Sequence, residues 1–517
     1  MVNFFAGIVM LGSLTLPAAG AACSDTVQLR DAQISRHKLS RNWNREVYTC
    51  PAVLVYRYGD KLSSLGVEYC ARKEQFAYRT QDGDAFNRWK IGADSYLPFR
   101  GKHVLWGNAS YEQKRLRGIT MCSTADFDKL YPQISADIYL HDSFTEEYRF
   151  CGGYGKKSER WNWGVSGDFR ALDEYRKKDP RAANVVSELE VKMGASRKFG
   201  DRYGVFLGGA CQKYKQSSSV KSFAEAQRLQ QLLMMGPSSY YLRFSNDEIL
   251  ALYKGYVFGV AGGLFTRNNT GPEVFLRYRR SHFDRTISKV NLTPISSLRE
   301  DESRAVISWK GTLGGCSTGV KASGEYVHRT GIENLLGSPN GDLYPVEASF
   351  EQYYSTRVNV IGSIFFEYDF GGFLSLGISP YGGIRNFDER NLLPSQLQKI
   401  HALNLGGDLM LLKPLGSRHL IVVSGTADFI KIGEKEQHLT DGKLVVQEVY
   451  METGRGLIIG QNFRQLTTDF FRYIVSARYS CTFTSSLGFF LEGSFSERLF
   501  AEPQENHTFI LSAGILF

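Results

Sequence analysis

Few residues in this sequence are placed to carry acid–base chemistry. The chain has nine histidines in 517 residues, and two of them stand near an aspartate, as His141-Asp142 and as His282 with Asp284. A hydrolytic barrel would use such a pair, with serine, near its outer rim. His141 and Asp142 are adjacent, and adjacent residues on a strand point to opposite faces. We therefore predict no catalytic residues and no enzyme activity.

Signatures for metals and cofactors are also missing from the sequence. There is no HExxH, no G-x-S-x-G, no Walker A loop and no glycine-rich strand-to-helix fingerprint. The eight cysteines show neither CxxC nor zinc-ligand spacing. We expect no metal and no cofactor, and a disulfide such as Cys50–Cys70 is permitted but not required.

A larger group of charged residues falls on the polar side of alternating segments. Such side chains would line a pore and set its ion preference, or would pair across strands inside a wet or plugged interior. Because both signs are present, strong ion selectivity is not predicted, and pairing is the main expectation. The predicted pore-lining residues are Lys90, Asp94, Asp168, Arg170, Glu188, Glu190, Lys192, Arg277, Arg279, Glu367, Asp408, Asp428, Arg472, Arg478 and Glu492.

The elements that position these charges are strands. Segments of roughly 10–14 residues alternate with period two between turn residues, as in the stretch from Phe471 to Phe483. No linker or change of pattern interrupts them from about residue 48 onward, and no apolar run reaches the ~18 residues of a membrane helix. The pattern predicts an all-β fold, a single antiparallel transmembrane β-barrel of about 20 strands, in a range of 16–22, with long extracellular loops.

The two ends of the chain carry sorting signals. Residues 1–22 resemble a cleavable signal peptide, although its first residues lack Lys or Arg, and lipidation of Cys23 stays open. At the other end, apolar residues at alternate positions lead to a final aromatic, a pattern that outer-membrane assembly machinery recognises. The predicted assembly signal is Phe509, Leu511, Ile515 and Phe517. We thus expect a Gram-negative outer-membrane protein whose partners are membrane lipid and the barrel-assembly machinery.

This organisation predicts three parts: a signal peptide (1–22), a short periplasmic segment (23–47) and the barrel (48–517). Only about 25 residues lie between the signal and the first strand near Tyr48, too few for the large plug of a TonB-dependent transporter. Long connections are predicted near 172–183, 215–253, 284–302, 329–346, 384–398 and 431–466, all on one side. Long connections on one side should alternate with short turns on the other, and the connection predicted at 114–130 is long where a short turn is expected.

One long connection has a helical composition. Residues 220–235 place Phe223, Leu229, Leu232 and Leu233 at spacings that give one apolar face. The predicted helix would lie on the surface, cap the mouth of the barrel, or fold into the lumen.

The formal net charge of +9 does not indicate nucleic-acid binding. Lysines and arginines are spread along the chain beside acidic residues, with no basic patch interleaved with aromatics. Such runs are typical of solvated loops and a wet interior.

Short motifs resemble a family of Bacteroidota outer-membrane β-barrel proteins of unknown function. The strand from Trp89 to Tyr96, followed by the strand from Val104 to Tyr111, is similar to the "fgaegY…lyGsfsY" region of that family. Leu130-Tyr-Pro-Gln133 and Asp179-Pro-Arg181 look like its PY and DPR elements. Residues 134–140 depart from the family's Asp/Gly-rich segment. The resemblance implies a barrel over nearly the whole mature chain, and it implies no activity.

A barrel of this width leaves a lumen unless loops fill it. The leading expectation is a porin-like passive channel or transporter for small solutes. The alternative is a plugged barrel that acts in surface adhesion or as an assembly partner, and an outer-membrane hydrolase is third. The solute and the oligomeric state are left open.

Overall fold

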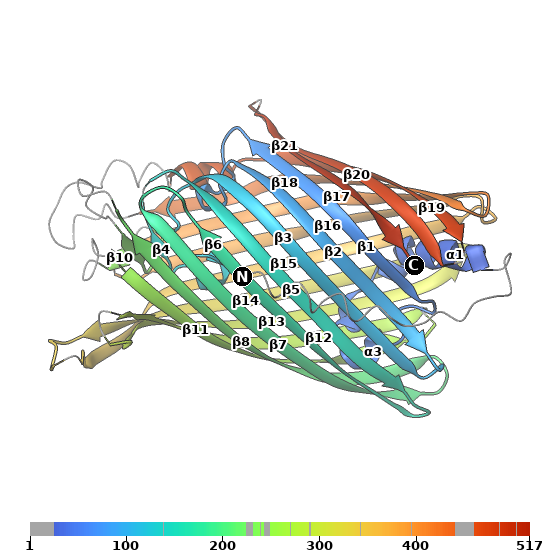
Figure 1. Cartoon of the computed structure of the whole chain (residues 1–517), viewed down its shortest axis with the longest axis horizontal. Helices are drawn as coiled ribbons and strands as arrows, with labels where there is room; N and C mark the ends of the chain where they lie inside the picture. Colours follow the sequence, from blue (N-terminus) through green and yellow to red (C-terminus); the bar gives the residue numbers. More distant parts are fainter. Residues whose placement is uncertain are drawn as a thin grey trace.

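The strands close into a single barrel in the computed structural model (Figure 1). The described residues, 25–517 without 138, 224–230, 238, 242–248, 269, 289–290, 342, 394, 440–459, 485 and 503, contain eighteen strands in one antiparallel sheet. The barrel strands are β1 (Leu62–Glu74), β2 (Ala85–Phe99), β3 (His103–Ile119), β5 (His141–Lys157), β6 (Trp161–Tyr175), β7 (Arg181–Phe199), β8 (Tyr203–Lys221), β11 (Ile249–Thr266), β12 (Gly271–Ile287), β13 (Pro294–Leu313), β14 (Cys316–Leu336), β15 (Val346–Asp369), β16 (Ser375–Asn391), β17 (Gln396–Leu415), β18 (His419–His438), β19 (Phe470–Thr484), β20 (Leu487–Phe500) and β21 (Asn506–Leu516).

Closure comes from the pairing of β21 with β1. Their register runs from Ser64 opposite Leu516 to Glu74 opposite Asn506. Beyond it, Phe517 and Ser63 exchange backbone hydrogen bonds of 2.9 and 2.7 Å. Every barrel strand therefore has two hydrogen-bonded neighbours, and the sheet has no free edge. The predicted antiparallel barrel is confirmed, and its eighteen described strands fall within the predicted range.

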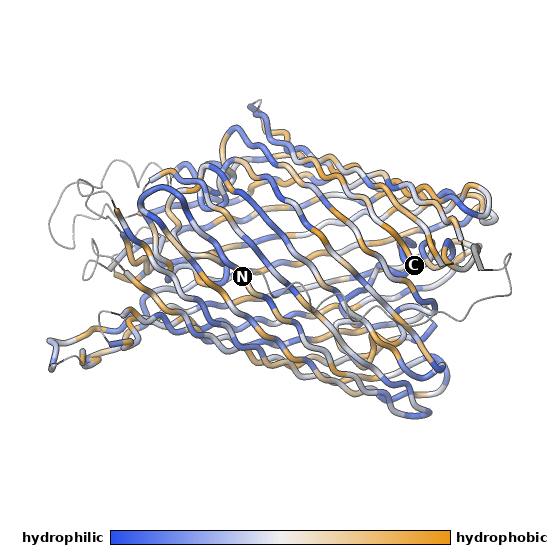
Figure 2. Tube along the Cα trace, viewed as in Figure 1, coloured by the Kyte–Doolittle hydropathy of each residue, from blue (hydrophilic) through white to orange (hydrophobic). Residues whose placement is uncertain are grey.

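The outer face of the barrel is apolar. Along β21, Phe509, Leu511, Ile515 and Phe517 are 42–50% exposed, and the residues between them face inward. Figure 2 shows the same alternation of apolar and polar residues around the wall. A continuous exposed apolar band on a closed sheet is the surface that a lipid-facing barrel presents.

The two ends of the barrel differ in their connections. At the end that holds the C-terminus, on the right in Figure 1, the turns are short, such as 100–102, 200–202 and 416–418. The opposite end carries the connections 120–140, 222–248 and 439–469. All six predicted long connections fall at this second end, but the predicted length was wrong for three of them. The strands continue into these segments, so β6 and β7 are joined by 176–180, β12 and β13 by 288–293, and β16 and β17 by 392–395. The expected exception at 114–130 was wrong, because β3 continues to Ile119 and the long connection after it lies at the same end as the others.

The chain before β1 lies against the inside of the barrel at the short-turn end. It forms α1 (Asp25–His37), α2 (Leu39–Asn42), the 3-10 turn η3 (Glu46–Thr49) and α3 (Pro51–Leu54). In chain order these contact β1, β18 and β19, then β15, then β12, and finally β5 to β8. We call residues 25–58 the girdle, because they follow the inner wall around this end.

The prediction of a first strand near Tyr48 was therefore wrong. Tyr48 lies in a 3-10 turn, Pro51 occupies the first turn of α3, and the first strand begins at Leu62. Proline is favoured at the start of a helix and cannot donate to a sheet ladder. The apolar residues that suggested a strand, including Val47 and Val53, instead pack against inward-facing aromatics of the barrel.

At the other end, two connections fold inward over the mouth. The connection after β3 contains α4 (Phe127–Leu130) and β4 (Ser135–Ala136), and β4 pairs with β9 (Leu232–Met234), which pairs with β10 (Tyr240–Tyr241). We call residues 120–137 together with β9 the mouth cap. The predicted helix at 220–235 was wrong where the structure describes it, because β8 continues to Lys221 and residues 232–234 form a buried strand. Residues 224–230 lie outside the described residues.

The signal peptide and Cys23 also lie outside the described residues. The seven described cysteines, Cys50 and Cys70 among them, form no disulfide. Among the described residues, no helix has the length and apolar character needed to cross a membrane.

Candidate functional site: a chamber beneath the mouth

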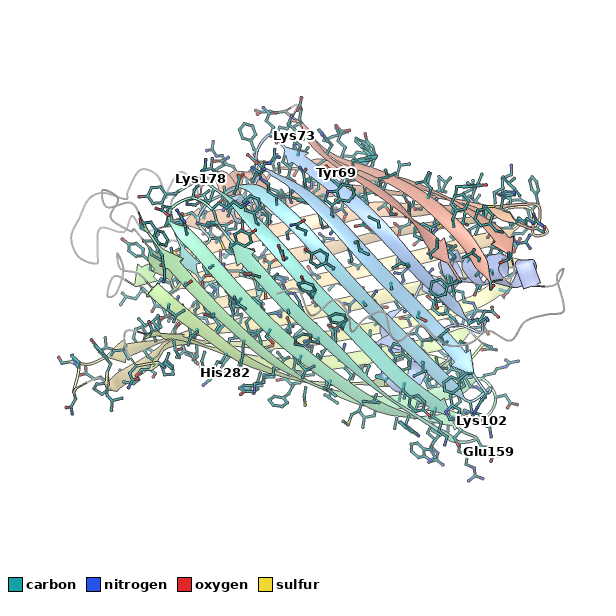
Figure 3. All side chains as sticks on the ribbon, viewed as in Figure 1. Tyr69, Lys73, Lys102, Glu159, Lys178 and His282 are labelled. Atoms are coloured by element: carbon teal, nitrogen blue, oxygen red, sulfur yellow. The ribbon has the colours of Figure 1, made fainter. Side chains whose placement is uncertain are left out.

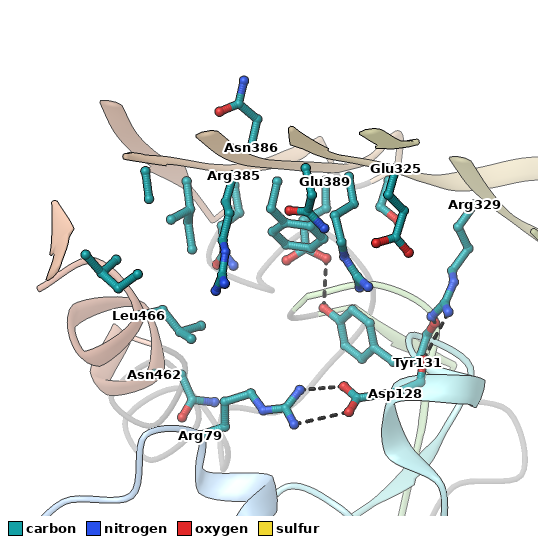
Figure 4. A pocket seen from close by; sticks show the side chains of 18 of the residues that line it. Arg79, Asp128, Tyr131, Glu325, Arg329, Arg385, Asn386, Glu389, Asn462 and Leu466 are labelled. Carbon is teal, nitrogen blue, oxygen red and sulfur yellow. Dashed lines mark hydrogen bonds and ion pairs between the residues drawn. The ribbon is translucent and has the colours of Figure 1, made fainter. Parts of the chain in front are cut away.

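A chamber lies inside the barrel beneath the mouth cap (Figure 4). Its volume is about 610 Å³. Its wall consists of inward-facing residues of β13 to β19, and its roof consists of residues 78–81, 127–131, 237, 462 and 466. On the girdle side, Arg304 of the chamber wall binds Glu46 at 2.9 Å. The chamber thus extends between the two segments that occupy the lumen.

The roof is joined by ion pairs between connections distant in sequence. Arg79, from the β1–β2 connection, binds Asp128 of α4 at 2.5 Å and Asp82 at 2.8 Å. The backbone N–H of Thr80 donates to Asn462 at 2.8 Å. Burial opposes ionisation of Asp128, but the hydrogen bonds and charge of Arg79 hold the pKa of this carboxyl below its usual value. The roof is therefore a layer in which separate connections are held together by ion pairs and hydrogen bonds.

Arg170 anchors one side of the mouth cap to the wall. Its guanidinium binds Asp126 of the cap at 2.8 Å and, on the wall, Glu147 at 2.7 Å and Glu188 at 3.2 Å. Lys129 of the cap binds Glu188 at 2.8 Å. Burial opposes ionisation of Asp126, yet its bonds to Arg170 hold its pKa below the usual value. The charges of this wall are thus used to fix the cap.

The opposite side of the cap is anchored by a buried carboxylate. The hydroxyls of Tyr131 and Tyr353 donate to Glu389 at 3.0 and 2.8 Å. Arg329 donates to the backbone carbonyl of Tyr131 at 2.6 Å and binds Glu300 through its Nε at 2.8 Å. Tyr131 therefore connects the cap to β14, β15 and β16.

The root of the cap holds a third buried cluster. Asp137 accepts from Ser123 at 2.5 Å, binds Arg176 at 2.6 Å and lies 3.1 Å from His141. Burial opposes ionisation of Asp137, but His141 and Arg176 keep its pKa below the usual value. The aspartate stands between the serine and the histidine, so Ser123 bonds to a carboxylate of lowered pKa, which is a weak base. The cluster fixes the turn into β5.

Two arginines project into the chamber without an ion pair. Arg357 of β15 and Arg385 of β16 line the cavity, and both are exposed to it. Neither has an acidic partner within 4 Å among the described residues, and Glu325 is the acidic lining residue that is likewise unpaired there. In the register of β15 with β16, Asn359 lies opposite Arg385 and Arg357 lies opposite Phe387. The two arginines are thus diagonal neighbours on one face, about 7–8 Å apart at Cα.

Aromatic side chains complete the chamber wall. Tyr78, Phe127, Phe387 and Phe470 line it together with Tyr353. A guanidinium pair beside aromatic surface can hold an anion that also carries an apolar part, because Arg binds carboxylate and phosphate bidentately. The chamber therefore has the chemistry of a binding site for a small organic anion.

The structure places the predicted pore-lining charges on the inner face and joins most of them in pairs. Arg149 binds Asp168 at 2.8 Å, and Lys192 binds Glu190 at 2.7 Å. The remaining contacts are those of Asp94 with Arg36, Arg277 with Glu302, Arg279 with Gln212, Glu367 with Ser40, Asp408 with Thr426, Asp428 with Arg472, and Arg478 with Glu492. None of the predicted residues lines the chamber. That they line a conducting path stays a prediction.

The histidine–aspartate pairs do not form a catalytic site. His282 and Asp284 lie 3.1 Å apart on the outer face, in the same alternation as the exposed Tyr278. Asp142 binds Arg115 at 2.7 Å on the outer face, whereas His141 points inward, as the strand geometry requires. Within the described chain, no cluster of three or more His, Cys, Asp or Glu side chains is placed to hold a metal ion.

Comparison with known families identifies the chain at the level of family. Residues 51–517 match DUF6850, a family of unknown function. The chain belongs to this family. The match covers every barrel strand, and no curated protein matches the chain significantly.

Solved barrels resemble the fold at low sequence identity. The copper transporter OprC is 8% identical with a TM-score of 0.42, covering 88% of this chain and 80% of its own. The ferric preacinetobactin receptor BauA from Acinetobacter baumannii is 9% identical with a TM-score of 0.40, covering 89% and 80%. The ferric citrate transporter FecA is 10% identical with a TM-score of 0.36, covering 90% and 79%. None of these TM-scores reaches 0.5, so the similarities do not bear on substrate or mechanism.

The predicted site residues include none of the chamber residues, although the alternation in β15 marks two of them as inward-facing. Val358 and Val360 are apolar and face outward, so alternation alone would have placed Arg357 and Asn359 on the inner face. Nothing in the sequence distinguishes Arg357 from the paired arginines, because pairing depends on which strands and connections lie beside it.

Proposed function

We propose that this protein is an outer-membrane barrel that binds small organic anions in the chamber and passes them across the membrane through movement of the segments that occupy its lumen. The observation that carries the proposal is the pair of unpaired guanidiniums of Arg357 and Arg385, diagonal neighbours in an aromatic-walled cavity of about 610 Å³. An anion bound there would form the ion pairs that the two guanidiniums lack within 4 Å among the described residues.

The occupied lumen favours a gated carrier over an open porin. The girdle follows the inner wall at one end, and the mouth cap is fixed to both sides of the barrel at the other. A water-filled channel needs no such structures. The outer-membrane location is supported by the closed sheet and its apolar outer band.

The test uses the folded protein in detergent with benzoate as the probe, and benzyl alcohol as its neutral analogue. Benzoate should raise the melting temperature in a concentration-dependent way, and benzyl alcohol should not. R357Q/R385Q should lose the shift. The matched control is R390Q, since Arg390 stacks on Tyr354 on the outer face. An equal benzoate shift in R357Q/R385Q would contradict anion binding in the chamber.

Planar-bilayer recording tests the gated arrangement separately. The protein should show no steady conductance of water-filled size, and benzoate uptake into proteoliposomes should depend on Arg357 and Arg385. A large steady conductance would contradict the gated arrangement and would indicate a passive porin instead.

A second role, in surface adhesion, is favoured by one projecting hairpin. The ends of β14 and β15 pair with each other beyond the last pairs with β13 and β16, from Asn334 opposite Ser349 to Leu336 opposite Val346. Leu335 and Val346 are 47% and 44% exposed there, and the hairpin projects from the mouth end in Figure 1. Shortening the hairpin should reduce cell-surface attachment if this role holds, and should leave benzoate binding unchanged.

A further inference from the structure

The outer face of β8, β11, β12 and β13 carries a group of basic side chains near the mouth end. Lys213 and Lys215 lie on β8, Lys254 on β11, and Arg299 on β13, and all four are exposed. We call these four residues the basic patch.

Strand register shows that the basic patch faces outward as one surface. Lys215 lies directly opposite Lys254, and residues opposite each other on paired strands share a face. Lys213 lies opposite Tyr256, which is 48% exposed on the outer wall. On the next pair of strands, Arg299 lies opposite His282, which Figure 3 labels on the outside of the barrel.

The charge of the basic patch is compensated only in part. None of its four side chains has an acidic group within 4 Å among the described residues. Nearby, Asp284 lies 3.1 Å from His282, and Asp301 lies 3.9 Å from Arg280 and accepts from Tyr278 at 2.5 Å. In the register of β11 with β12, however, Asp284 lies directly opposite Lys254 on the same face, and Asp301 is held by residues of the neighbouring strand β12. The excess of positive charge therefore rests mainly on Lys213, Lys215 and Arg299.

The opposite part of the outer face carries both paired and unpaired basic residues. Lys399 of β17 binds Glu436 at 2.8 Å, and His401 contacts Asp388 at 2.9 Å and Glu434 at 3.1 Å. Lys431 is exposed there without an acidic group within 4 Å among the described residues, but no basic residue of a neighbouring strand lies directly opposite it.

The basic patch begins where the apolar band ends. Along β8 the outward positions run Tyr203, Val205, Leu207, Gly209 and Cys211 before the two lysines. At about 3.3 Å per residue and a tilt of about 45°, this stretch rises about 20 Å along the membrane normal, close to the ~25 Å height of a lipid-facing band. Lys213 and Lys215 therefore stand at the level of lipid headgroups.

From this position and charge, we propose that the basic patch binds the phosphate groups of an anionic glycolipid in the outer leaflet. Adjacent lysines and an arginine at headgroup height attract anionic headgroups electrostatically, and the apolar side chains below them contact the acyl chains. The proposal rests on the outer-membrane location proposed above and does not depend on the chamber.

The test measures binding of lipid A by native mass spectrometry of the delipidated full-length protein in detergent. The probes are lipid A with two phosphates, the same lipid without phosphates, and inorganic phosphate as competitor. K213Q/K215Q/K254Q/R299Q should bind phosphorylated lipid A at least tenfold more weakly than the unchanged protein. The matched control K399Q/K431Q, on the opposite outer face, should stay within twofold.

Three results would overturn the proposal. They are equal binding by the patch variant, equal binding of the lipid without phosphates, and displacement of lipid A by millimolar inorganic phosphate. Heat-modified gel migration checks that the variant is folded, and K215Q and K254Q singly replace it if it is not. The benzoate shift should be unchanged in the patch variant, and sucrose-gradient fractionation tests the membrane location, so each proposal can fail separately.

Discussion

The two segments that occupy the lumen both pack against the barrel through apolar side chains and differ in how their polar contacts are arranged. In the girdle, Val47 and Val53 are fully buried against wall aromatics such as Phe265, and the ion pairs are spread along the segment, such as Glu46 with Arg304. In the mouth cap, residues 130–136 and 232–234 also pack against the wall, and the ion pairs on one side centre on Arg170, while the hydroxyl of Tyr131 binds Glu389 on the other. Apolar packing is insensitive to charge state, whereas each buried ion pair depends on both partners being present and ionised.

The two segments should therefore respond differently to the loss of a single side chain. An apolar contact is non-directional and is retained through small movements. The directional bonds to Arg170 are lost together when that side chain is removed. The predictions below test this contrast, from the largest expected effect to the smallest.

Arg170→Met should release the mouth cap. Removing the shared cation leaves Asp126, Glu147 and Glu188 without their partner. This should lower the free energy of unfolding by about 3–5 kcal/mol. Hydrogen exchange followed by mass spectrometry should speed up in residues 120–137 and stay unchanged in α1. The control is R149M on the adjacent strand, whose pair with Asp168 is solvent-exposed and worth less than about 1 kcal/mol. If R170M and R149M exchanged equally fast in residues 120–137, Arg170 would not be an anchor of the mouth cap.

Val53→Ala should loosen the girdle alone. Trimming a fully buried valine costs about 2 kcal/mol, and exchange should increase in residues 46–58 without a change in the mouth cap. Thr49→Ala, at an exposed position of the same segment, provides the control. Loosening of both segments by V53A would show that they are coupled rather than independent.

Mild acid should loosen the girdle before the mouth cap. Burial, with the charges of Arg478, Arg36 and Arg45, lowers the pKa of His37 in α1 from 6.5 to about 4. The docked form thus contains neutral His37, and its stabilisation is complete above pH 6.5 and is lost as the pH falls toward 4. At pH 5.5 the loss is about 1.4 kcal/mol.

The aspartates of the mouth cap respond in the opposite direction. The pKa values of Asp126 and Asp128 lie below their usual 3.8, so their ion pairs persist throughout this window and are lost only at lower pH. Hydrogen exchange at pH 7.5 and 5.5, corrected for intrinsic rates, should therefore differ in α1 and agree in residues 126–129 of the mouth cap. His37→Gln should remove the difference, and its persistence in that variant would assign the effect to another group.

Tyr131→Phe should have the smallest effect. It removes one of the two hydroxyls that donate to Glu389 and leaves that of Tyr353 in place, which costs about 1 kcal/mol. A small decrease in melting temperature with faster exchange near residue 131 is expected. A loss as large as that of R170M would show that this side of the cap, rather than the Arg170 side, is the main anchor.

The barrel wall was predictable because its signal is local. Alternation at period two depends only on which face of a strand meets lipid, and the outward positions of β21 follow it without exception from Phe509 to Phe517. The same rule places charged residues such as Glu188 and Arg472 on the inner face of the barrel. The strand count differed because the apolar residues near Tyr48 imitate a strand while lying in helical turns inside the barrel.

The candidate site was not predictable by the same means. Arg357 and Arg385 matter because they lack acidic partners within 4 Å among the described residues, and this depends on strands and connections hundreds of residues apart, such as Thr80 with Asn462 in the roof. The inward fold of Leu232, Leu233 and Met234 likewise depends on pairing with β4, almost one hundred positions earlier in the chain.

The sequence by itself therefore determined that the chain is a closed antiparallel barrel with an apolar outer face, because periodicity along a strand is a property of neighbouring residues. The tertiary structure alone decided what fills the lumen, which charges are paired and where two arginines are left free. Those features arise where segments that are distant in sequence contact each other inside the closed sheet, and the periodicity of the sequence does not predict such contacts.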